Sequence, residues 1–574
     1  MKFLKIIFRI LFVSCITYFF YYLIIKYFNS IFSAKSLIFP YVVHPFDLCT
    51  KIPLAWYYIK LIFKISITFN LIIILNSVFS YFFPNKKKNQ IKHIKKPKGT
   101  KLSLFVGNSA VKNIPVYINE KGLYQNILVT GTIGSGKTSS LMYPLCKQLM
   151  FYCKDNIFKK IGMLILDVKG NFYKQVLEYA KEANRLDDVI VIELNGKYKY
   201  NPLHKPDLSP QVLANRLKTI LLLFSPNNSE SYWLDEAEKV IAEGIKLCRL
   251  YNNGYVTFKE LHKLITKENY YIQKLEILKT IFRSGKLSKQ QVYDLHSSLL
   301  FFENEFLKLD SRVLSILKSE ITRITSTFIS NFEILNTFSP EKEDLDFLGF
   351  NDVLRNGKIV VLNMNISEYE NLSKIIAAYL KLDFQAEVIM QLSNNKEIKT
   401  TAFICDEYHE YVTATDSKFF AQSREAKCIN IVATQSYSSL LNTLKDSSSV
   451  KVITQNLINK LWFRTDDLLT IEDAQKQIGK EEKHYSSKSI SENAKETNYN
   501  YFTSSLLSKN SSISESINES INLDFVYDTN FFTQNLETFS CLSFISNGNN
   551  ILPPQKIKTI PYFRRSKWKK LYFI

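Results

Sequence analysis

The chain has 574 residues, several times the usual length of one domain, so more than one folded unit is expected. Its 74 Lys and Arg against 53 Asp and Glu give a net charge of +21, but 15 of these bases and a single acid, Asp47, lie in residues 1–100. The rest of the chain is only mildly basic, and its charge gives little support to nucleic-acid binding. The eight cysteines are scattered singly, which argues against a disulfide scaffold or a cysteine zinc site and indicates a reducing compartment.

The first hundred residues carry two apolar runs of membrane-spanning length, at about 6–25 and 65–83. A cleaved signal peptide is the competing interpretation for the first run, but that run is bulky and no small-residue cleavage site follows it. Seven lysines then fall within residues 85–98, where a basic flank indicates the cytoplasmic side; a DNA-tracking stripe is the alternative. We therefore expect residues 1–98 to form a membrane anchor with two transmembrane helices, followed by a cytoplasmic motor.

A nucleotide-binding loop follows the apolar run at residues 126–130. Residues 131–138 read G-x-x-x-x-G-K-T and precede a helical pattern, which is the strand, loop and helix setting that a P-loop requires. Glycines let such a loop wrap its backbone N–H groups around phosphate oxygens. Lys137 is expected to reach the β- and γ-phosphates of ATP, and the Thr138 hydroxyl to bind Mg²⁺. The residues predicted to cradle the nucleotide are Gly131, Thr132, Gly134, Ser135, Gly136, Lys137, Thr138 and Ser139.

The second half of such a site is a carboxylate at the end of a buried strand, with a neighbouring acid that polarises the attacking water. Two apolar runs end on an acid, at Asp167 and at Asp406. Only the second run continues with a Glu, so Asp406 is predicted to hold Mg²⁺ and Glu407 to activate water. For Asp167, a role in the site and a plain strand end both stay open.

The pattern of apolar runs predicts an α/β motor. Val, Ile and Leu runs at 189–192, 359–362, 429–433 and 460–463 alternate with helical segments, as in a parallel sheet buried on both faces. Between 209 and 339 amphipathic helical repeats occur without a clear buried strand, which favours an inserted all-α domain over helices that merely cover the sheet. The motor is thus assigned to 99–208 and 340–574. Residues 479–522, rich in Ser, Asn, Lys and Glu, are predicted to be a flexible polar loop or linker.

Taken in order, these motifs resemble one family, the type IV coupling proteins, which are hexameric DNA-translocating ATPases of conjugation and type IV secretion. One departure is Asp-Val-Lys-Gly at 167–170, where family members commonly carry Asp-Pro-Lys-Gly, so this turn is less rigid. The segment 479–522 has no family motif to match. The matching residues are Gly131 to Thr138, Leu166 to Gly170, Tyr200 to Leu203, Tyr232-Trp233, Asp406-Glu407, Ser423 to Glu425, Ala433 to Ser436 and, more weakly, Pro561 to Phe563.

The resemblance implies a RecA-like P-loop motor that forms a ring of six subunits with ATP between neighbours. Arg424 matches an arginine that reaches into the adjacent subunit's site, where it would stabilise charge on the transferring phosphoryl group. A surface arginine on a helix is the alternative. Gln435 matches the family's γ-phosphate-sensing glutamine, and the helical insertion matches an all-α domain associated with substrate recognition.

The resemblance also implies a function: a multi-pass inner-membrane ATPase that uses ATP and Mg²⁺ to pass DNA toward the channel of a type IV secretion system. The DNA is expected to be single-stranded and joined to a relaxase-type protein, and the pore to contact mostly its phosphates. Two other functions stay open. A septal-type double-stranded DNA translocase shares the nucleotide motifs, although the helical insertion speaks against it, and an adaptor that recruits effector proteins needs little DNA contact.

Overall fold

The structure, a computed structural model, describes residues 22, 57, 61, 64, 65, 68, 102–223, 231–364, 366–393, 398–493, 498–500, 505–507 and 512–564. Across these ranges, no helix combines the length and the apolar character needed to cross a membrane. The two spans predicted at about 6–25 and 65–83 and the lysine cluster at 85–98 fall outside the described residues, apart from isolated positions. The chain divides into two units, Met1–Ile91 and Lys92–Ile574, and the fold below is that of the second.

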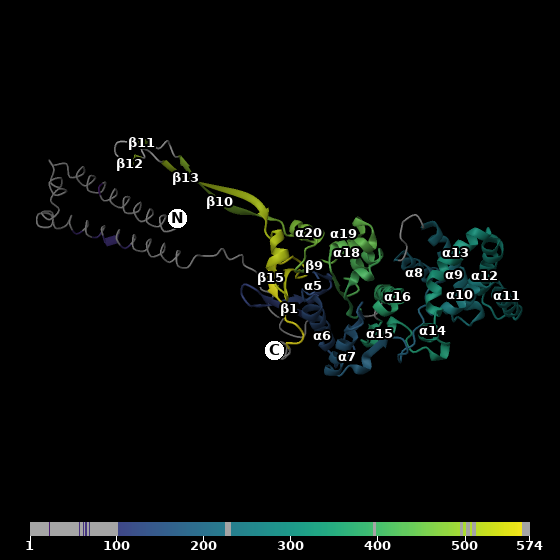
Figure 1. Cartoon of the computed structure of the whole chain (residues 1–574). Coiled ribbons are helices and arrows are strands. Elements are labelled where there is room, and N and C mark those ends of the chain that lie inside the picture. The colour runs from purple at the N-terminus through teal and green to yellow at the C-terminus, as the bar shows by residue number, and fades with distance from the viewer. Residues whose placement is uncertain are drawn as a thin grey trace, which may run out of the picture. The chain divides into compact units, whose positions relative to one another are not determined.

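An eleven-stranded sheet forms the centre of this unit, in the order β2-β1-β15-β14-β9-β3-β8-β7-β4-β6-β5. Three of its strands, β1, β9 and β15, are labelled in Figure 1. From β9 to β5 every neighbouring pair is parallel, and nearly all residues of these strands are buried, as in a sheet covered on both faces. The predicted α/β fold with a mostly parallel sheet is confirmed. These strands are β9 (Asn459–Phe463), β3 (Ile127–Thr130), β8 (Cys428–Thr434), β7 (Thr401–Cys405), β4 (Gly162–Leu166), β6 (Ile359–Leu362) and β5 (Val189–Ile192).

An antiparallel extension on the β9 side of the sheet was not predicted. Here β14 pairs with β9 and β15, β15 with β1, and β1 with β2, all antiparallel. The extension brings segments from both ends of the motor together, since Asn108 lies opposite Lys558. Its strands are β1 (Ser103–Ser109), β2 (Pro115–Asn119), β14 (Ser540–Phe544) and β15 (Gln555–Lys558).

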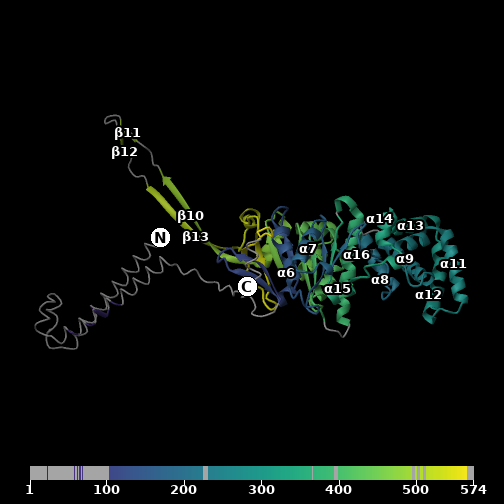
Figure 2. The ribbon, with the colours of Figure 1, turned by 90° about the horizontal axis from the view of Figure 1, so that it is seen from below.

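Helices cover both faces of the sheet because successive strand side chains point to opposite sides. Ile127 and Val129 belong to the core that includes α6 and α7, whereas Leu128 belongs to the core that includes α16 and α18. Figure 2 shows these layers from below. The covering helices are α6 (Tyr143–Phe151), α7 (Phe172–Glu182), α15 (Phe350–Asn356), α16 (Ile366–Ser393), α17 (Asp416–Gln422), α18 (Tyr437–Leu444), α19 (Ser447–Asn456) and α20 (Leu468–Ile478).

A block of helices from Pro210 to Phe338 contains no strand among its described residues and gathers beyond α15 and α16 (Figures 1 and 2). A buried polar cluster joins this all-α module to the motor. Asp383 of α16 accepts hydrogen bonds from Tyr200 at 3.0 Å and Arg216 at 2.9 Å, and pairs with Lys205 at 2.6 Å. Burial alone would raise the Asp383 pKa, but the two cations hold it below its ordinary value. The module helices are α8 (Pro210–Leu223), α9 (Ser231–Tyr251), α10 (Phe258–Thr266), α11 (Glu268–Arg283), α12 (Lys289–Leu300), α13 (Ser311–Thr325) and α14 (Phe332–Phe338).

Most of the segment expected to be a polar loop or linker forms paired strands instead. β10 (Lys480–Asn493) and β13 (Ser512–Phe525) pair antiparallel along their whole length, and short strands β11 (Asn498–Asn500) and β12 (Ser505–Leu507) follow toward the turn. Backbone hydrogen bonds between the two strands form this hairpin. Its composition gave no alternating apolar signal because the hairpin packs little on the core, and Ile517 and Ile521 are exposed.

Candidate nucleotide site

The predicted loop and the predicted acid pair meet at one edge of the sheet. β3 ends at the loop and β7 ends at Asp406, and both strands run parallel to β8 between them, so their carboxyl ends lie at the same edge. The Thr138 hydroxyl donates a hydrogen bond to Oδ2 of Asp406 at 2.7 Å, across 268 residues of sequence. The side chains assigned to Mg²⁺ therefore lie in direct contact.

The loop needs glycine at two closely packed positions. Gly131 has φ of 153° and Gly136 has φ of 96°, both in the region that side chains disfavour. A Cβ on Gly131 would lie 2.6 Å from Cβ of Phe463, and one on Gly136 would lie 2.5 Å from Cδ1 of Phe539. Phe539 also donates its backbone N–H to the Ser135 carbonyl at 3.2 Å. This contact with Phe539 was missed because no motif marks a residue that packs there from the far end of the chain.

Lys137 lies inside the loop it belongs to. Its side chain is buried, and its Nζ donates to the carbonyls of Gly131 and, at 3.2 Å, of Thr132. Burial lowers the pKa of Lys137, while the negative charges of Glu407 and Asp406 oppose that shift. The ammonium group is thus held by backbone oxygens and by the field of the acid pair.

Two neighbouring strand ends and the C-terminal segment fix the loop. Gly131 donates its backbone N–H to the Gln435 carbonyl at 3.2 Å, and Thr132 donates its own to the Arg464 carbonyl at 2.8 Å. On the helix side, the Ser139 carbonyl accepts from the backbone N–H of Tyr562 at 2.9 Å. Gln435 therefore lies beside the loop, at the end of β8, with a half-buried side chain.

Asp406 is buried, and the carboxylates of Asp167 and Glu407 act on its charge. Burial, followed by the negative charges of Asp167 and Glu407, raises the pKa of Asp406 to about 6, against the hydrogen bond from Thr138 and the charge of Lys137. At neutral pH the carboxylate is therefore ionised at a cost that a bound divalent cation would relieve.

Glu407 combines a strained backbone conformation with a carboxylate oxygen that accepts no hydrogen bond from the described residues. Its φ is 49°, in the left-handed region, and its N–H donates to Oδ1 of Asp406 at 3.1 Å. Oε1 lies 3.6 Å from Nζ of Lys169, and Oε2 lies 3.8 Å from Nδ1 of His409. Oε2 is buried, and no described residue gives it a hydrogen bond. A buried, unpaired carboxylate oxygen is suited to accept a proton from a water molecule held beside it.

Asp167, whose role the sequence leaves open, stabilises the turn after β4. Its carboxylate accepts three backbone hydrogen bonds, from Lys169 at 3.1 Å, Asn171 at 2.9 Å and Phe172 at 3.0 Å. The N–H groups of Asn171 and Phe172 lie at the start of α7, where a negative charge is favourable. Asp167 thus fixes the turn after β4 and reaches the site only through its charge, which contributes to the raised pKa of Asp406.

The structure does not bring Arg424 to the nucleotide site of its own chain. Arg424 is exposed and lies between α17 and β8, before the strand begins. Because β3 and β8 are parallel, this is the edge opposite to the P-loop. The adjacent Ser423 is buried and donates to Oδ1 of Asn126 at 3.1 Å, an atom that also accepts from Asn430 at 2.7 Å. Ser423 is therefore structural, while Arg424 is presented to solvent.

The side chains present fit Mg²⁺ and a triphosphate. A hydroxyl and a carboxylate are the hard oxygen ligands that Mg²⁺ prefers, and this ion usually takes only one or two protein ligands beside phosphates and water. Within the described part of the chain, no cluster of three or more His, Cys, Asp or Glu could hold a metal by itself. The N–H groups and Lys137 of the loop suit the phosphates.

Fold and site together define an α/β protein with a glycine-rich loop beside an acid pair and with an all-helical module. A family model described as the type IV secretion-system coupling protein DNA-binding domain matches residues 315–521. No curated protein matches the chain. This match confirms the resemblance to the type IV coupling proteins that the motifs indicate.

Solved structures of the plasmid coupling protein TrwB share the fold. The unbound monoclinic form of the bacterial conjugative coupling protein TrwBdeltaN70 is 12% identical, with a TM-score of 0.52, and the match covers 81% of this chain and 89% of that chain. TrwB in complex with ADP and Mg²⁺ is 12% identical, with a TM-score of 0.52 and coverage of 79% and 89%. TrwB with the non-hydrolysable GTP analogue GDPNP is 11% identical, with a TM-score of 0.50 and the same coverage.

Proposed function

We propose that the chain is a coupling ATPase that hydrolyses ATP to move DNA toward a type IV secretion channel. The observation that carries the proposal is the contact between Thr138 and Asp406, which supports one composite Mg²⁺ and phosphate site. The matched family domain is described as DNA-binding, and a protein of the same fold was solved with ADP and Mg²⁺. The first finding supports DNA as the substrate, and the second supports ATP and Mg²⁺ as cofactors.

Each side chain has a proposed role. Thr138 and Asp406 hold Mg²⁺, which neutralises charge on the phosphates when bound. Lys137 leaves the loop carbonyls to bind the β- and γ-phosphates. Glu407 takes a proton from the attacking water through its free Oε2. Gln435, beside the loop at the end of β8, senses the γ-phosphate.

The ring is proposed from the position of Arg424. An exposed arginine on the edge opposite to the P-loop cannot act in its own site but can reach the site of a neighbour in a closed ring. No ion pair with a described residue holds its guanidinium. We propose a homo-hexamer at the inner membrane, anchored by residues 1–98, that passes single-stranded DNA with a relaxase-type protein to the secretion channel components.

ATP turnover of the full chain with and without single-stranded DNA tests the motor. Lys137→Ala should abolish turnover and weaken nucleotide binding, because the loop loses its only side-chain cation. Lys181→Ala, which removes an exposed lysine of α7, is the matched control and should leave both unchanged. Unchanged turnover in Lys137→Ala would refute the site, and turnover indifferent to DNA would favour the adaptor.

Mixing two inactive variants tests the ring. Rings that combine Arg424→Ala and Glu407→Gln subunits contain some interfaces where both wild-type groups meet, so partial turnover should return. Full activity of Arg424→Ala alone, together with no recovery on mixing, would show that the arginine has no role across the interface.

A further inference from the structure

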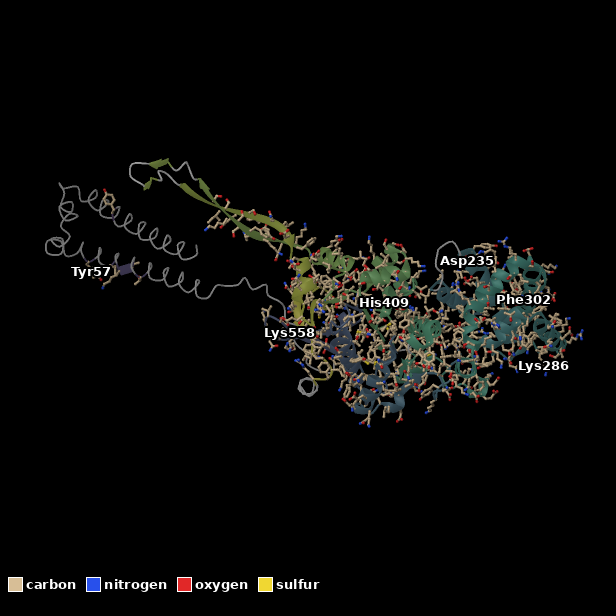
Figure 3. The ribbon with its side chains drawn as sticks, in the orientation of Figure 1. Tyr57, Asp235, Lys286, Phe302, His409 and Lys558 are labelled. Atoms are coloured by element: carbon tan, nitrogen blue, oxygen red, sulfur yellow. The ribbon has the colours of Figure 1, made fainter. Side chains whose placement is uncertain are left out.

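An apolar groove lies between two helices of the all-α module, remote from the nucleotide site. α11 and α12 both pack against α9. The groove between α11 and α12 has a volume of about 500 Å³. Figure 3 shows Lys286, in the connection between these helices, at the far end of the module from His409. Leu278 and Leu295 are buried at the groove, and Phe282, Val292, Tyr293 and Leu299 line it.

The groove is formed by one stripe from each helix. Leu278 and Phe282 are four residues apart on α11, and Val292, Leu295 and Leu299 follow at helical spacing on α12, so each set shares one helix face. Two large aromatic side chains remain open to solvent here, since Phe282 is 54% and Tyr293 is 70% exposed. These two side chains lie over buried leucines, so the groove offers an apolar surface that the apolar side chains of a partner can cover.

The charge around the groove has one sign. Lys279 and Lys289 line it together with the apolar residues, and among the described residues no Asp or Glu does so. Lys279 bonds Glu276 of its own helix at 2.9 Å, and both side chains are largely exposed, so this pair contributes little. Asp294 of α12 does not line the groove and accepts from Gln290 at 3.0 Å.

We propose that this groove binds an amphipathic helix of a partner protein, with apolar side chains on one face and acidic residues beside them. Two helix stripes with an apolar floor form the receptor of helix-in-groove recognition, in which the ligand inserts residues spaced three and four apart. The basic rim selects acidic flanks and disfavours basic ones. Nucleic acid fits less well, because its phosphates would find donors only at the rim, while the floor between the helices is apolar.

The test uses the full chain and a fluorescent peptide of about 18 residues that carries Leu at helical spacing and Glu on both flanks. A twin peptide has Lys in place of each Glu. Fluorescence anisotropy should show saturable binding of the Glu peptide and binding of the Lys peptide that is weaker by about tenfold. The double variant Lys279→Glu and Lys289→Glu should reverse that preference.

Variants of exposed residues separate binding from folding. Phe282→Glu should weaken binding of the Glu peptide by at least about tenfold, as expected for an aromatic anchor. Phe282→Leu should bind nearly as the wild type does, because it stays apolar. Phe332→Glu on α14 is the matched control, since this phenylalanine is 78% exposed in the same module but lies outside the groove.

Three results would overturn the proposal. Equal binding of the two peptides would remove the acidic preference. Unchanged binding in Phe282→Glu would place the peptide elsewhere. If no peptide binds and Phe282→Glu instead disperses the assembled full chain, the groove is an interface between copies. None of these readouts needs ATP turnover, so they are independent of the proposed motor function.

Discussion

Replacing Asp406 by Asn is expected to stabilise the protein without nucleotide while abolishing its response to Mg²⁺. The pKa of this buried carboxyl is raised from 3.8 to about 6, so keeping it ionised at neutral pH costs about 3 kcal/mol of folding free energy. Asparagine is neutral and can still accept the hydrogen bond from Thr138. It cannot accept the Glu407 N–H, which costs about 1 kcal/mol. The expected net gain is about 2 kcal/mol.

The gain in stability of Asp406→Asn over the wild type should be largest at high pH and shrink as pH falls. A carboxyl whose pKa is raised by folding destabilises the protein above that pKa, and the penalty is relieved as pH falls toward the unfolded value of 3.8. The penalty on the wild type is therefore complete at pH 8, about half as large at pH 5, and absent below the unfolded pKa. The neutral variant lacks this dependence.

Melting temperatures of the full chain at pH 8 and pH 5 measure the effect. Without nucleotide, Asp406→Asn should melt above the wild type at pH 8, and the difference should shrink at pH 5. Added ATP and Mg²⁺ should raise the melting temperature of the wild type more than that of the variant, since the variant keeps the phosphate-binding loop but lacks the metal carboxylate. Asp466→Asn, at an exposed position, is the control. Equal or lower stability of Asp406→Asn at pH 8 would refute this account of the site.

Three further changes test the surroundings of the site. Gly136→Ala should destabilise the protein by about 1–3 kcal/mol and weaken nucleotide binding, because a Cβ there would meet Phe539. Gly254 has a similar positive φ but open space where a Cβ would lie, so Gly254→Ala should lower the melting temperature less. Equal losses in the two variants would contradict the packing argument. Asp416→Asn leaves the fully buried Lys381 without its carboxylate and should cost about 3–5 kcal/mol, and a loss below about 1 kcal/mol would show that the pair is dispensable. ATP turnover should fall as pH drops through about 6, because Asp406 becomes protonated, and should recover partly with excess Mg²⁺; a Mg²⁺ requirement that is the same at pH 5.5 and pH 7.5 would contradict this.

The loop and the acid pair could be predicted because each is encoded locally. Glycine spacing specifies a loop that wraps phosphate, and an apolar strand that ends on Asp406 and Glu407 specifies a carboxylate edge. The parallel sheet then brings them together, as Thr138 and Asp406 show. Asp167 has the same strand-end signature, and only the turn that follows it, which returns three N–H groups to its carboxylate, makes it structural.

The remaining features depend on contacts that sequence patterns do not record. Phe539 packs on Gly136 because antiparallel strands fold the end of the chain back onto the loop. The hairpin of β10 and β13 follows from backbone pairing in a polar segment. The groove at Phe282 depends on how α11 and α12 lie on α9, which helical periodicity alone does not fix.

The most direct test of the motor is the rate of ATP hydrolysis by the full chain, with and without single-stranded DNA, for the wild type and Glu407→Gln. We expect DNA to accelerate the wild type, and Glu407→Gln to bind ATP yet hydrolyse it about 100-fold more slowly or worse, as for loss of a general base. Wild-type rates in Glu407→Gln, or a wild type that ignores DNA, would contradict the account.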